Sequence, residues 1–405
     1  MTPEASIALI KANLAEVLNP EIIDDVILNQ KRPLKVYWGT APTGKPHCGY
    51  FVPMVKVAEL LHAGCHVKIL IADIHAYLDN MKAPLELVEY RAQYYEFLIK
   101  SLLTAIGVDI AKLEFVRGSS YQLEKDYTMD RYKLEGVTRI SVAQKAGAEV
   151  VKQMDDPCLG GLIYPLMQAL DEQYLDVDCQ AGGVDQRKIF TFALENLPRI
   201  GYKVRAHLMN AMVPGLGAAA KMSSSEPDSK IDLLDTPEDV GKKLKKAHCA
   251  PKTLEGNGVV AFVEHVIFRV QAIKTGGKPR FVVERERDGL EALVYDDIAK
   301  LKDDFEKDIL TPQLLKAALT KALNDLLAPI RTEYLASEAW QKVSEAAYPP
   351  EKKVVKEKKV KSLGDPAKKA EAERKKAEAK AAKEAAKAQQ GGVEGVKDGV
   401  DKLNV

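Results

Sequence analysis

A glycine-rich loop near residue 40 holds the first residues that could do chemistry. The segment Gly39-Thr-Ala-Pro-Thr-Gly44-Lys45 matches most of the pattern GxxxxGK[ST], in which backbone N–H groups hold phosphate oxygens. Pro46 stands where that pattern needs Ser or Thr, and it offers neither a hydroxyl for magnesium nor an N–H for phosphate. We therefore reject a P-loop NTPase as the interpretation of this loop.

The same loop ends in Pro-His47-Cys-Gly49-Tyr, at the predicted start of a helix. Helix N-termini carry unpaired N–H groups and a partial positive charge, which suit a polyphosphate. The imidazole of His47 could donate to phosphate oxygens, and Gly49 leaves room for a flat base to approach the backbone. A single histidine at a helix start is more often a structural cap, so this motif needs a second one beside it.

A second candidate loop lies about 170 residues further along the chain, at Lys221-Met222-Ser223-Ser224-Ser225. It follows the Gly/Ala/Pro stretch VPGLGAAA. A lysine and three hydroxyls on such a loop could close over phosphates. The alternative for this segment taken alone is a solvated surface loop, so its interpretation depends on the first loop.

Three polar residues share one face of a predicted helix. Tyr164 and Gln168 lie seven and three residues before Asp171. Positions i, i+4 and i+7 of a helix lie on one face, so these side chains can line one wall of a pocket. For any one of them, a satisfied internal hydrogen bond is the alternative.

The elements that must position these residues follow the rhythm of an open parallel α/β sheet. Strands and helices alternate, with strands predicted over 36–38, 66–72 and 113–116 and helices over 50–62 and 84–106. Such sheets bind ligands beyond the carboxyl ends of their strands, where the segments 37–49 and 73–75 lie. Residues 1–31 are predicted to form an amphipathic helical lead-in.

The chain divides into three predicted parts. Residues 1–231 form a Rossmann-like α/β domain with a parallel sheet, and residues 232–348 form a mostly α-helical domain with Lys/Glu-rich faces. Residues 349–405 form a basic low-complexity tail of Lys, Ala and Glu. The tail has strong helix formers but almost no apolar stripe, so we predict a disordered or solvated helical segment.

The charge is distributed unevenly along the chain of 405 residues. The total formal charge is +1, but residues 351–405 hold 16 basic and 10 acidic residues, so the tail is +6 and the body −5. A basic tail could attract RNA non-specifically, because lysines that pair with phosphates release counterions. A solubilising tail is the alternative.

Composition excludes several other classes. A hydrophobic fraction of 46% excludes wholesale disorder. Five cysteines without a CxxC pair indicate neither a zinc ribbon nor a disulfide framework, and we predict no metal held by protein ligands. No apolar stretch approaches the ~18 residues of a membrane span, and the first residues lack a signal-peptide core. We expect a reduced, soluble, cytoplasmic protein without a membrane partner.

Together the two loops resemble the "HIGH" and "KMSKS" motifs of the class I aminoacyl-tRNA synthetases. Within that class, the sequence resembles the eukaryotic cytosolic tyrosyl enzymes closely from about residue 30 to 250, and more weakly beyond. The segments that carry this resemblance are VYWGTAPTGKP at 36–46, ADIHAYLDNMKAP at 72–84, GLIYPLMQALDE at 161–172, GGVDQRKIF at 182–190 and HLMNAMVPGL at 207–216.

The resemblance implies a two-step reaction. The carboxylate of tyrosine attacks the α-phosphate of ATP and releases pyrophosphate, and the tyrosyl group then passes to the 3′-terminal adenosine of tRNA. The carboxylate is itself the nucleophile, so catalysis should consist of positioning and stabilisation of phosphate charge. The residues expected to bind ATP, which brings Mg²⁺ as its complex, are His47, Gly49, Gly183, Asp185, Lys221, Ser223 and Ser225.

By the same resemblance, Tyr37 and Asp171 bind the phenol hydroxyl of tyrosine. The resemblance also implies that Tyr164, Gln168 and Gln186 bind the amino and carboxylate groups of tyrosine. Discrimination against phenylalanine then depends on one hydroxyl; the tyrosyl enzymes are themselves the well-known example of this principle, with a ratio of about 10⁵ reached without editing. Further positions in the matching motifs, expected to lie beside the substrates, are Gly39, Thr43, His75, Met222 and Ser224.

The sequence departs from the family pattern at several positions. Ser224 replaces the second lysine of the phosphate loop, as in other eukaryotic tyrosyl enzymes, and a bound monovalent cation near it could supply the missing charge. Ala181 stands where an aromatic residue is expected, which predicts a looser pocket wall. Leu314 and the segment 288–290 differ from the residues that usually read the anticodon, so we assign no anticodon contacts.

The expected partners are L-tyrosine, ATP and tRNA(Tyr), with no prosthetic group. The family implies a homodimer, formed through a region inserted in the catalytic domain. Two alternatives are a tryptophanyl-tRNA synthetase-like ligase and a catalytically silent RNA-binding relative. The presence of Tyr37 with Asp171 favours a phenol, and the presence of His47, Gly49 and Lys221 disfavours the silent relative.

Overall fold

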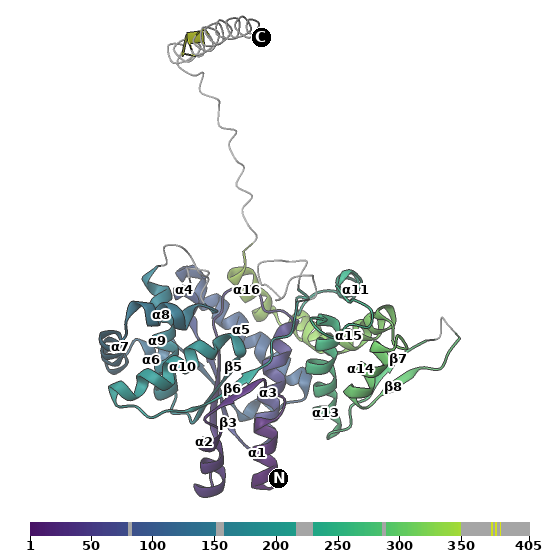
Figure 1. Ribbon diagram of the computed structural model, residues 1–405, viewed down its shortest axis with the longest axis horizontal. Coiled ribbons are helices and arrows are strands. Elements are labelled where there is room, and N and C mark those ends of the chain that lie inside the picture. The colour runs from purple at the N-terminus through teal and green to yellow at the C-terminus, as the bar shows by residue number, and fades with distance from the viewer. Residues whose placement is uncertain are drawn as a thin grey trace, which may run out of the picture. The chain divides into compact units, whose positions relative to one another are not determined.

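A computed structural model describes residues 1–79, 83–150, 158–215, 230–285 and 289–349, with Arg374, Lys375, Ala377, Glu378 and Ala381 beyond them. Residues 1–349 form one compact unit, shown in Figure 1, and residues 350–405 form a second unit. The fold below is that of the first unit. The predicted basic tail, 349–405, lies outside the described residues except for Pro349 and those five.

A six-stranded sheet lies at the centre of the N-terminal part, in the order β1-β6-β5-β2-β3-β4. Its strands are β1 (Glu16–Leu18), β2 (Lys35–Thr40), β3 (His66–Ile71), β4 (Leu113–Arg117), β5 (Cys179–Gly183) and β6 (Ala206–Asn210). All neighbouring pairs are parallel except β1 with β6. The three predicted strands are therefore confirmed as β2, β3 and β4, in a mainly parallel sheet.

Helices cover both faces of this sheet (Figure 1). They are α1 (Pro3–Lys11), α2 (Pro20–Asp24), α3 (Phe51–His62), α4 (Asp73–Leu78), α5 (Leu85–Ile106), α6 (Ser119–Gln122), α7 (Lys125–Val137), α8 (Ile140–Gly147), α9 (Leu159–Tyr174) and α10 (Arg187–Asn196). Pro84 caps the start of α5, and Gly107 ends it with φ of 96°, a left-handed conformation that suits glycine. The helices predicted at 50–62 and 84–106 are thus confirmed to within a residue.

The N-terminal lead-in is more irregular than predicted. α1 stops at Lys11, a short strand follows, and α2 continues into a π-helical turn over Asp25–Asn29. Strand β1 was not predicted, because its three residues carry no alternating pattern and its partner in β6 lies far away in sequence.

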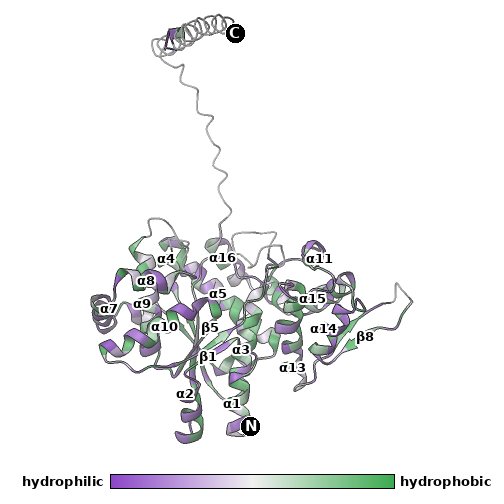
Figure 2. Ribbon diagram, in the orientation of Figure 1, coloured by the Kyte–Doolittle hydropathy of each residue, from purple (hydrophilic) through white to green (hydrophobic). Residues whose placement is uncertain are grey.

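The C-terminal part of the unit is mostly helical, as predicted. It contains α11 (Pro237–Lys246), α12 (Gly258–Phe262), α13 (Arg269–Thr275), α14 (Ile298–Glu306), α15 (Pro312–Ala336) and α16 (Glu338–Ala347), with an antiparallel pair of strands, β7 (Phe281–Val283) and β8 (Leu293–Tyr295). Figure 2 shows that helices such as α13 and α15 carry both hydrophilic and hydrophobic residues, as expected for helices with one buried face.

Both parts share one hydrophobic core. Helix α5 lies against the sheet and also packs against α15 and α16. The rings of Phe97 and Trp340 stack with their centroids 5.8 Å apart, and Tyr94 meets Tyr348 edge to face at 5.2 Å. These aromatic contacts fix the C-terminal helices against the helix that supports the sheet.

Candidate functional site

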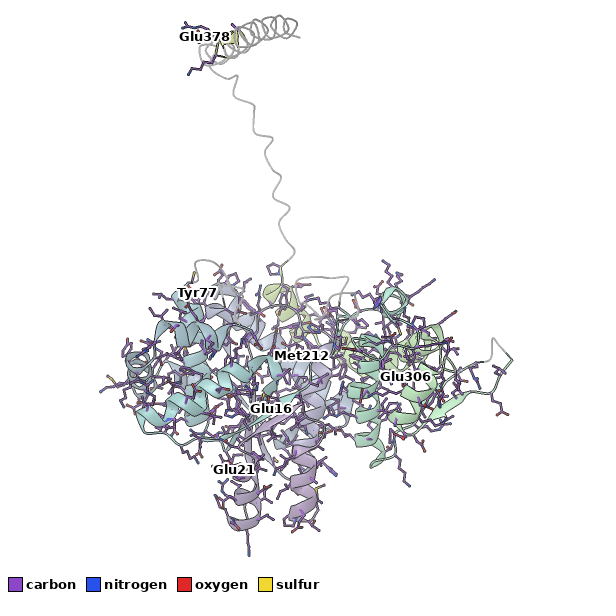
Figure 3. The ribbon with its side chains drawn as sticks, viewed as in Figure 1. Glu16, Glu21, Tyr77, Met212, Glu306 and Glu378 are labelled. Atoms are coloured by element: carbon purple, nitrogen blue, oxygen red, sulfur yellow. The ribbon has the colours of Figure 1, made fainter. Side chains whose placement is uncertain are left out.

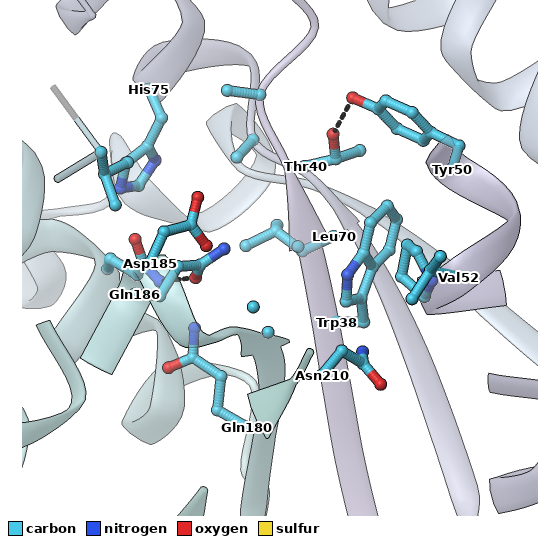
Figure 4. Close-up of a pocket in the computed structure, with 18 of the residues that line it drawn as sticks. Trp38, Thr40, Tyr50, Val52, Leu70, His75, Gln180, Asp185, Gln186 and Asn210 are labelled. Carbon is cyan, nitrogen blue, oxygen red and sulfur yellow. Dashed lines mark hydrogen bonds between the residues drawn. The ribbon is translucent and has the colours of Figure 1, made fainter. Parts of the chain in front are cut away.

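A cavity of about 390 Å³ lies at the carboxyl ends of β2, β3, β5 and β6 (Figure 4). Strand β2 is the point where the sheet divides, since β3 follows on one side and β5 and β6 lie on the other. Ligands of open parallel sheets bind at this kind of switch point. Helix α9 closes one side of the cavity with its polar face.

Every predicted site residue that the structure describes lines this one cavity. These residues are Tyr37, Gly39, Thr43, His47, Gly49, His75, Tyr164, Gln168, Asp171, Gly183, Asp185 and Gln186. The remaining predicted positions, Lys221, Met222, Ser223, Ser224 and Ser225, lie outside the described residues. The cavity therefore brings together positions from 37 to 186 that are far apart in sequence.

At the deep end of the cavity, Asp171 is fully buried. Its Oδ1 accepts hydrogen bonds from the hydroxyls of Tyr121 and Tyr127 and from the amide of Gln122, at 2.8, 3.1 and 2.8 Å. Its Oδ2 has no hydrogen-bond partner among the described residues, although His75 Nε2 lies 3.9 Å away. This arrangement leaves one buried carboxylate oxygen available to a ligand that can donate a hydrogen bond.

The electrostatics of the deep end follow from burial. Loss of hydration raises the pKa of Asp171 to about 7, although its three hydrogen-bond donors oppose that rise. Burial lowers the pKa of His75 to about 4, so this imidazole is neutral near pH 7. Its ring lies edge-on to the ring of Tyr164. Burial also raises the pKa of Tyr37, whose hydroxyl donates to the backbone carbonyl of Gln168 at 3.3 Å. The groups that contact the Asp171 carboxylate at this end are therefore neutral.

The middle of the cavity joins α9 to the segment that follows β5. The amide of Gln168 donates to Oε1 of Gln186 at 2.7 Å. A Cβ on Gly182 would lie 2.8 Å from the Phe190 ring, and one on Gly183 would lie 2.5 Å from Oδ1 of Asp185. The Phe190 ring therefore leaves little room for a side chain at 182, whereas the Asp185 carboxylate could rotate away from a Cβ at 183.

At the open end, the imidazole of His47 has a defined tautomer. Its Nδ1 accepts a hydrogen bond from the N–H of Gly49 at 3.1 Å. Burial, together with the nearby ammonium of Lys230, lowers the pKa of His47 to about 4. The neutral ring therefore carries its proton on Nε2, where it can donate to an anionic oxygen.

Side chains of α5 hold the loop that carries His47 by hydrogen bonds to its backbone carbonyls. The hydroxyl of Tyr95 donates to the Gly44 carbonyl at 2.6 Å, and the guanidinium of Arg91 donates to the Thr43 carbonyl at 2.7 Å. Both residues belong to α5. Tyr50 adds an edge-on aromatic contact to His47, 5.9 Å between ring centroids, so the loop is held on two sides.

Several cavity residues were missed by the sequence reasoning. Trp38, Gln180, Asn210 and Met212 all line the cavity, and Figure 4 shows the first three around its floor. Oε1 of Gln180 and Oδ1 of Asn210 are buried without a hydrogen-bond partner among the described residues. Met212, labelled in Figure 3, is partly exposed. Gln180, Asn210 and Met212 lie on or just after β5 and β6, which were not predicted as strands. Trp38 lies on the predicted strand β2, but its place there alone did not mark it as a site residue.

Ala181 is buried in the hydrophobic core, on β5 opposite Trp38, and it is not among the residues that line the cavity. Trp38, its partner in register, does line the cavity. A looser pocket wall beside Ala181 stays a prediction.

Among the residues that the structure describes, no group of three or more His, Cys, Asp or Glu side chains could hold a metal ion. None of the helices in the described part of the chain is long and apolar enough to cross a membrane.

Comparisons with known proteins give a consistent result. Residues 29–328 match the family model of class I tRNA synthetases for tryptophan and tyrosine. The chain is 54% identical over 365 residues to a protein of Saccharomyces cerevisiae named cytoplasmic tyrosine–tRNA ligase, covering 89% of this chain and 93% of the relative. A cytoplasmic tyrosine–tRNA ligase of Xenopus tropicalis is also 54% identical over 86% of this chain, but the chain spans only 64% of its length.

Solved structures agree with the sequence relatives. A tyrosyl-tRNA synthetase from Archaeoglobus fulgidus in complex with L-tyrosine superposes with a TM-score of 0.74 at 35% identity, over 82% of this chain and 99% of that one. A tryptophanyl-tRNA synthetase from Giardia lamblia, at 19% identity and a TM-score of 0.61, over 87% of this chain and 89% of that one, shares the fold alone. From the family match over most of the chain and these relatives, the chain belongs to the class I aminoacyl-tRNA synthetases for tryptophan and tyrosine.

Proposed function

We infer that this protein is a tyrosine–tRNA ligase, which uses ATP to activate L-tyrosine and transfers it to tRNA for cytoplasmic translation. The relatives that support this inference are named cytoplasmic tyrosine–tRNA ligases. The single observation that carries it is Asp171, whose Oδ2 is buried and has no hydrogen-bond partner among the described residues at the end of the cavity. A phenol hydroxyl fits this oxygen, whereas the indole of tryptophan would have to place its N–H there with a larger ring.

We propose that the tyrosine side chain lies between β2 and α9. Its hydroxyl donates to Oδ2 of Asp171 and lies near the hydroxyl of Tyr37, and both of these residues are buried. The amino and carboxylate groups then lie toward Tyr164, Gln168 and Gln186, where Gln168 and Gln186 are already hydrogen-bonded to each other. Phenylalanine would leave the buried Oδ2 unpaired, a cost of about 1–3 kcal/mol or more for a charged group.

We propose that ATP lies at the open end of the cavity, over the loop of residues 39–49 and the residues after β5. His47 can donate to a phosphate oxygen from Nε2 without carrying a charge, because its pKa is lowered to about 4. Asp185 would accept a hydrogen bond from the ribose, and Gly49 and Gly183 would let the backbone come close to the nucleotide. Mg²⁺ would enter as part of the ATP complex, and its charge would add to the stabilisation of the leaving pyrophosphate.

The Lys221–Ser225 segment is proposed to hold the pyrophosphate. Support comes from the residues on either side of it: Val213 lines the cavity, and Lys230 donates to the carbonyl of Lys45 at 3.5 Å. The N–H of Cys48 also donates to the carbonyl of Ile231 at 2.9 Å. The described residues before and after the segment therefore flank the cavity. The monovalent cation proposed near Ser224 belongs to the same part of the proposal.

We also propose partners that bind outside the cavity, namely tRNA and a second copy of the chain. The catalytic part at 1–231 would hold tyrosine and ATP, the helical part at 232–348 would contact tRNA, and the basic tail at 349–405 would attract RNA weakly. A homodimer is supported by large apolar side chains exposed on or beside α6–α9, namely Leu123, Met129, Tyr132, Ile140 and Leu159. Such exposed apolar residues on neighbouring helices are typical of an interface.

A panel of pyrophosphate-exchange reactions with each of the twenty amino acids tests the function. Exchange should depend on tyrosine, and exchange with tryptophan instead would overturn the proposal. Asp171→Ala should abolish tyrosine binding, while His47→Ala and Lys221→Ala should lower the rate of adenylation more than the affinity for tyrosine. The matched control is Asp176→Asn, because Asp176 is an exposed carboxylate that pairs with Lys35 and does not line the cavity.

A further inference from the structure

The three groups that hold Asp171 come from outside the cavity. Tyr121 and Gln122 belong to α6 and Tyr127 to α7, and none of them is among the residues that line the cavity. Tyr121 and Gln122 donate to the same oxygen, Oδ1, at 2.8 Å each. The Tyr127 hydroxyl lies 3.1 Å from Oδ1 and 3.0 Å from the backbone carbonyl of Met167, so its proton is shared between these two acceptors. A carboxylate held on one oxygen by these donors has little rotational freedom, so its second oxygen keeps a fixed orientation.

The position of Gln122 is itself determined by its surroundings. A Cβ on Gly118 would lie 2.7 Å from Oε1 of Gln122 and 2.9 Å from Oδ1 of Asp73. Asp73 accepts hydrogen bonds from the N–H of Ser119 at 2.8 Å and from its hydroxyl. The start of α6 is therefore packed against the segment after β3. This packing holds the Gln122 side chain within hydrogen-bonding distance of Asp171.

We propose that Gln122 and Tyr127 are positioning residues for amino-acid selection, which hold Asp171 by Oδ1 so that Oδ2 meets the hydroxyl of the substrate. The inference rests on the proposed role of Asp171. It adds that the preference for tyrosine over phenylalanine depends on residues that never touch the amino acid. Tyr121 supports the same oxygen, and its ring also packs in the core.

The charge balance around Asp171 supports this assignment. The groups that face it are His75 on α4, Glu172 on α9, Tyr37 on β2, and the donors on α6 and α7. Burial and Glu172 raise its pKa, while Gln122, Tyr121 and Tyr127 lower it. His75 contributes no positive charge near pH 7, since its own pKa is about 4. The donors therefore oppose the rise in the pKa of Asp171 that burial and Glu172 cause, and losing one raises that pKa further.

Tyr127→Phe tests the proposal, because it removes one hydroxyl and keeps the buried ring. The binding constant for tyrosine should weaken roughly tenfold at pH 7, within the range for a hydrogen bond to a charged group. The inhibition constant of L-phenylalanine in the exchange assay should stay unchanged, so the ratio of the two falls roughly tenfold. Gln122→Met, an independent variant, should act in the same direction.

The matched control is Tyr174→Phe. The Tyr174 ring packs against that of Tyr127 with centroids 4.8 Å apart, but its hydroxyl donates to Asp130 instead of Asp171. This variant should bind both amino acids as the unmodified protein does. If Tyr127→Phe weakened tyrosine and phenylalanine equally, or left both unchanged, the proposal would be wrong.

A pH profile separates positioning from a general packing effect. The loss of tyrosine affinity at low pH should begin at a higher pH in Tyr127→Phe than in the unmodified protein. The difference in affinity between the two proteins should become smaller by about pH 9, where the Asp171 carboxylate is ionised in both. A defect that is the same from pH 6 to pH 9 would contradict the proposal. Asp171→Asn separates this outcome from failure of the proposed function: retained selection of tyrosine in that variant would refute the role of Asp171 itself.

Discussion

Replacing Glu59 should test how strongly the two parts of the compact unit are joined. Glu59 is buried on α3, and its carboxylate lies 2.8 Å from the ammonium of Lys56 and 2.8 Å from the guanidinium of Arg269 on α13. Lys56 is also buried, and its ammonium donates to the carbonyls of Leu9, Ile10 and Ala12. One carboxylate thus balances two cations, one from the sheet region and one from the helical region.

The substitution Glu59→Gln keeps the size of the side chain and removes its charge. Two buried cations then lose the carboxylate that pairs with both of them, and removal of one member of a buried ion pair costs about 3–5 kcal/mol. Because Lys56 keeps its three carbonyls, we expect a loss near the lower limit, about 3 kcal/mol. For comparison, Glu338→Gln breaks a pair with Lys342 whose side chains are 82% and 73% exposed, so it should cost less than about 0.5 kcal/mol.

Urea unfolding followed by far-UV circular dichroism and tryptophan fluorescence gives the measurement. Trp38 lies in the sheet and Trp340 in the helical region, so the fluorescence reports on both parts. Coincident transitions would justify one free energy for the whole unit. A loss below about 1 kcal/mol for Glu59→Gln, relative to the Glu338→Gln control, would refute the reasoning that this buried cluster depends on its carboxylate.

Three further outcomes follow from the site. Gly182→Ala should raise the Michaelis constant for tyrosine severalfold in pyrophosphate exchange, because its Cβ would lie 2.8 Å from the Phe190 ring; an unchanged constant would contradict this. Arg91→Met removes the 2.7 Å hydrogen bond to the Thr43 carbonyl and should raise the Michaelis constant for ATP roughly tenfold with that for tyrosine unchanged. The imidazole of His47 should stay neutral as pH falls to about 5 in an NMR titration, since its pKa is about 4; protonation near pH 6.5 would show that burial has no such effect.

The sequence was most informative where structure is determined locally. Pro84 and Gly107 delimit α5, and the run HVKILI forms β3, because caps and β-branched runs act over a few residues. The face formed by Tyr164, Gln168 and Asp171 also follows from helix geometry alone, and all three residues do line the cavity. The prediction that these three side chains share one pocket wall is therefore confirmed.

Features that depend on distant contacts could not be predicted in this way. Strand β5 reads CQAGG, with two glycines and no β-branched residue, and forms because β2 and β6 flank it. The donors to Asp171 lie on α6 and α7, and no local sequence pattern shows that these helices approach α9. Likewise, the close approach of the Phe190 ring to Gly182 depends on how α10 packs after β5.

The shared role of α5 has a consequence for protein engineering. One stretch of this helix holds the loop near Thr43 and Gly44, and its aromatic side also receives Trp340 and Tyr348 from the last helical segment. A chimera that exchanged residues 232–348 with those of a relative would place foreign side chains against Tyr94 and Phe97. Such a graft would need the matching surface of α5 to be transplanted with it.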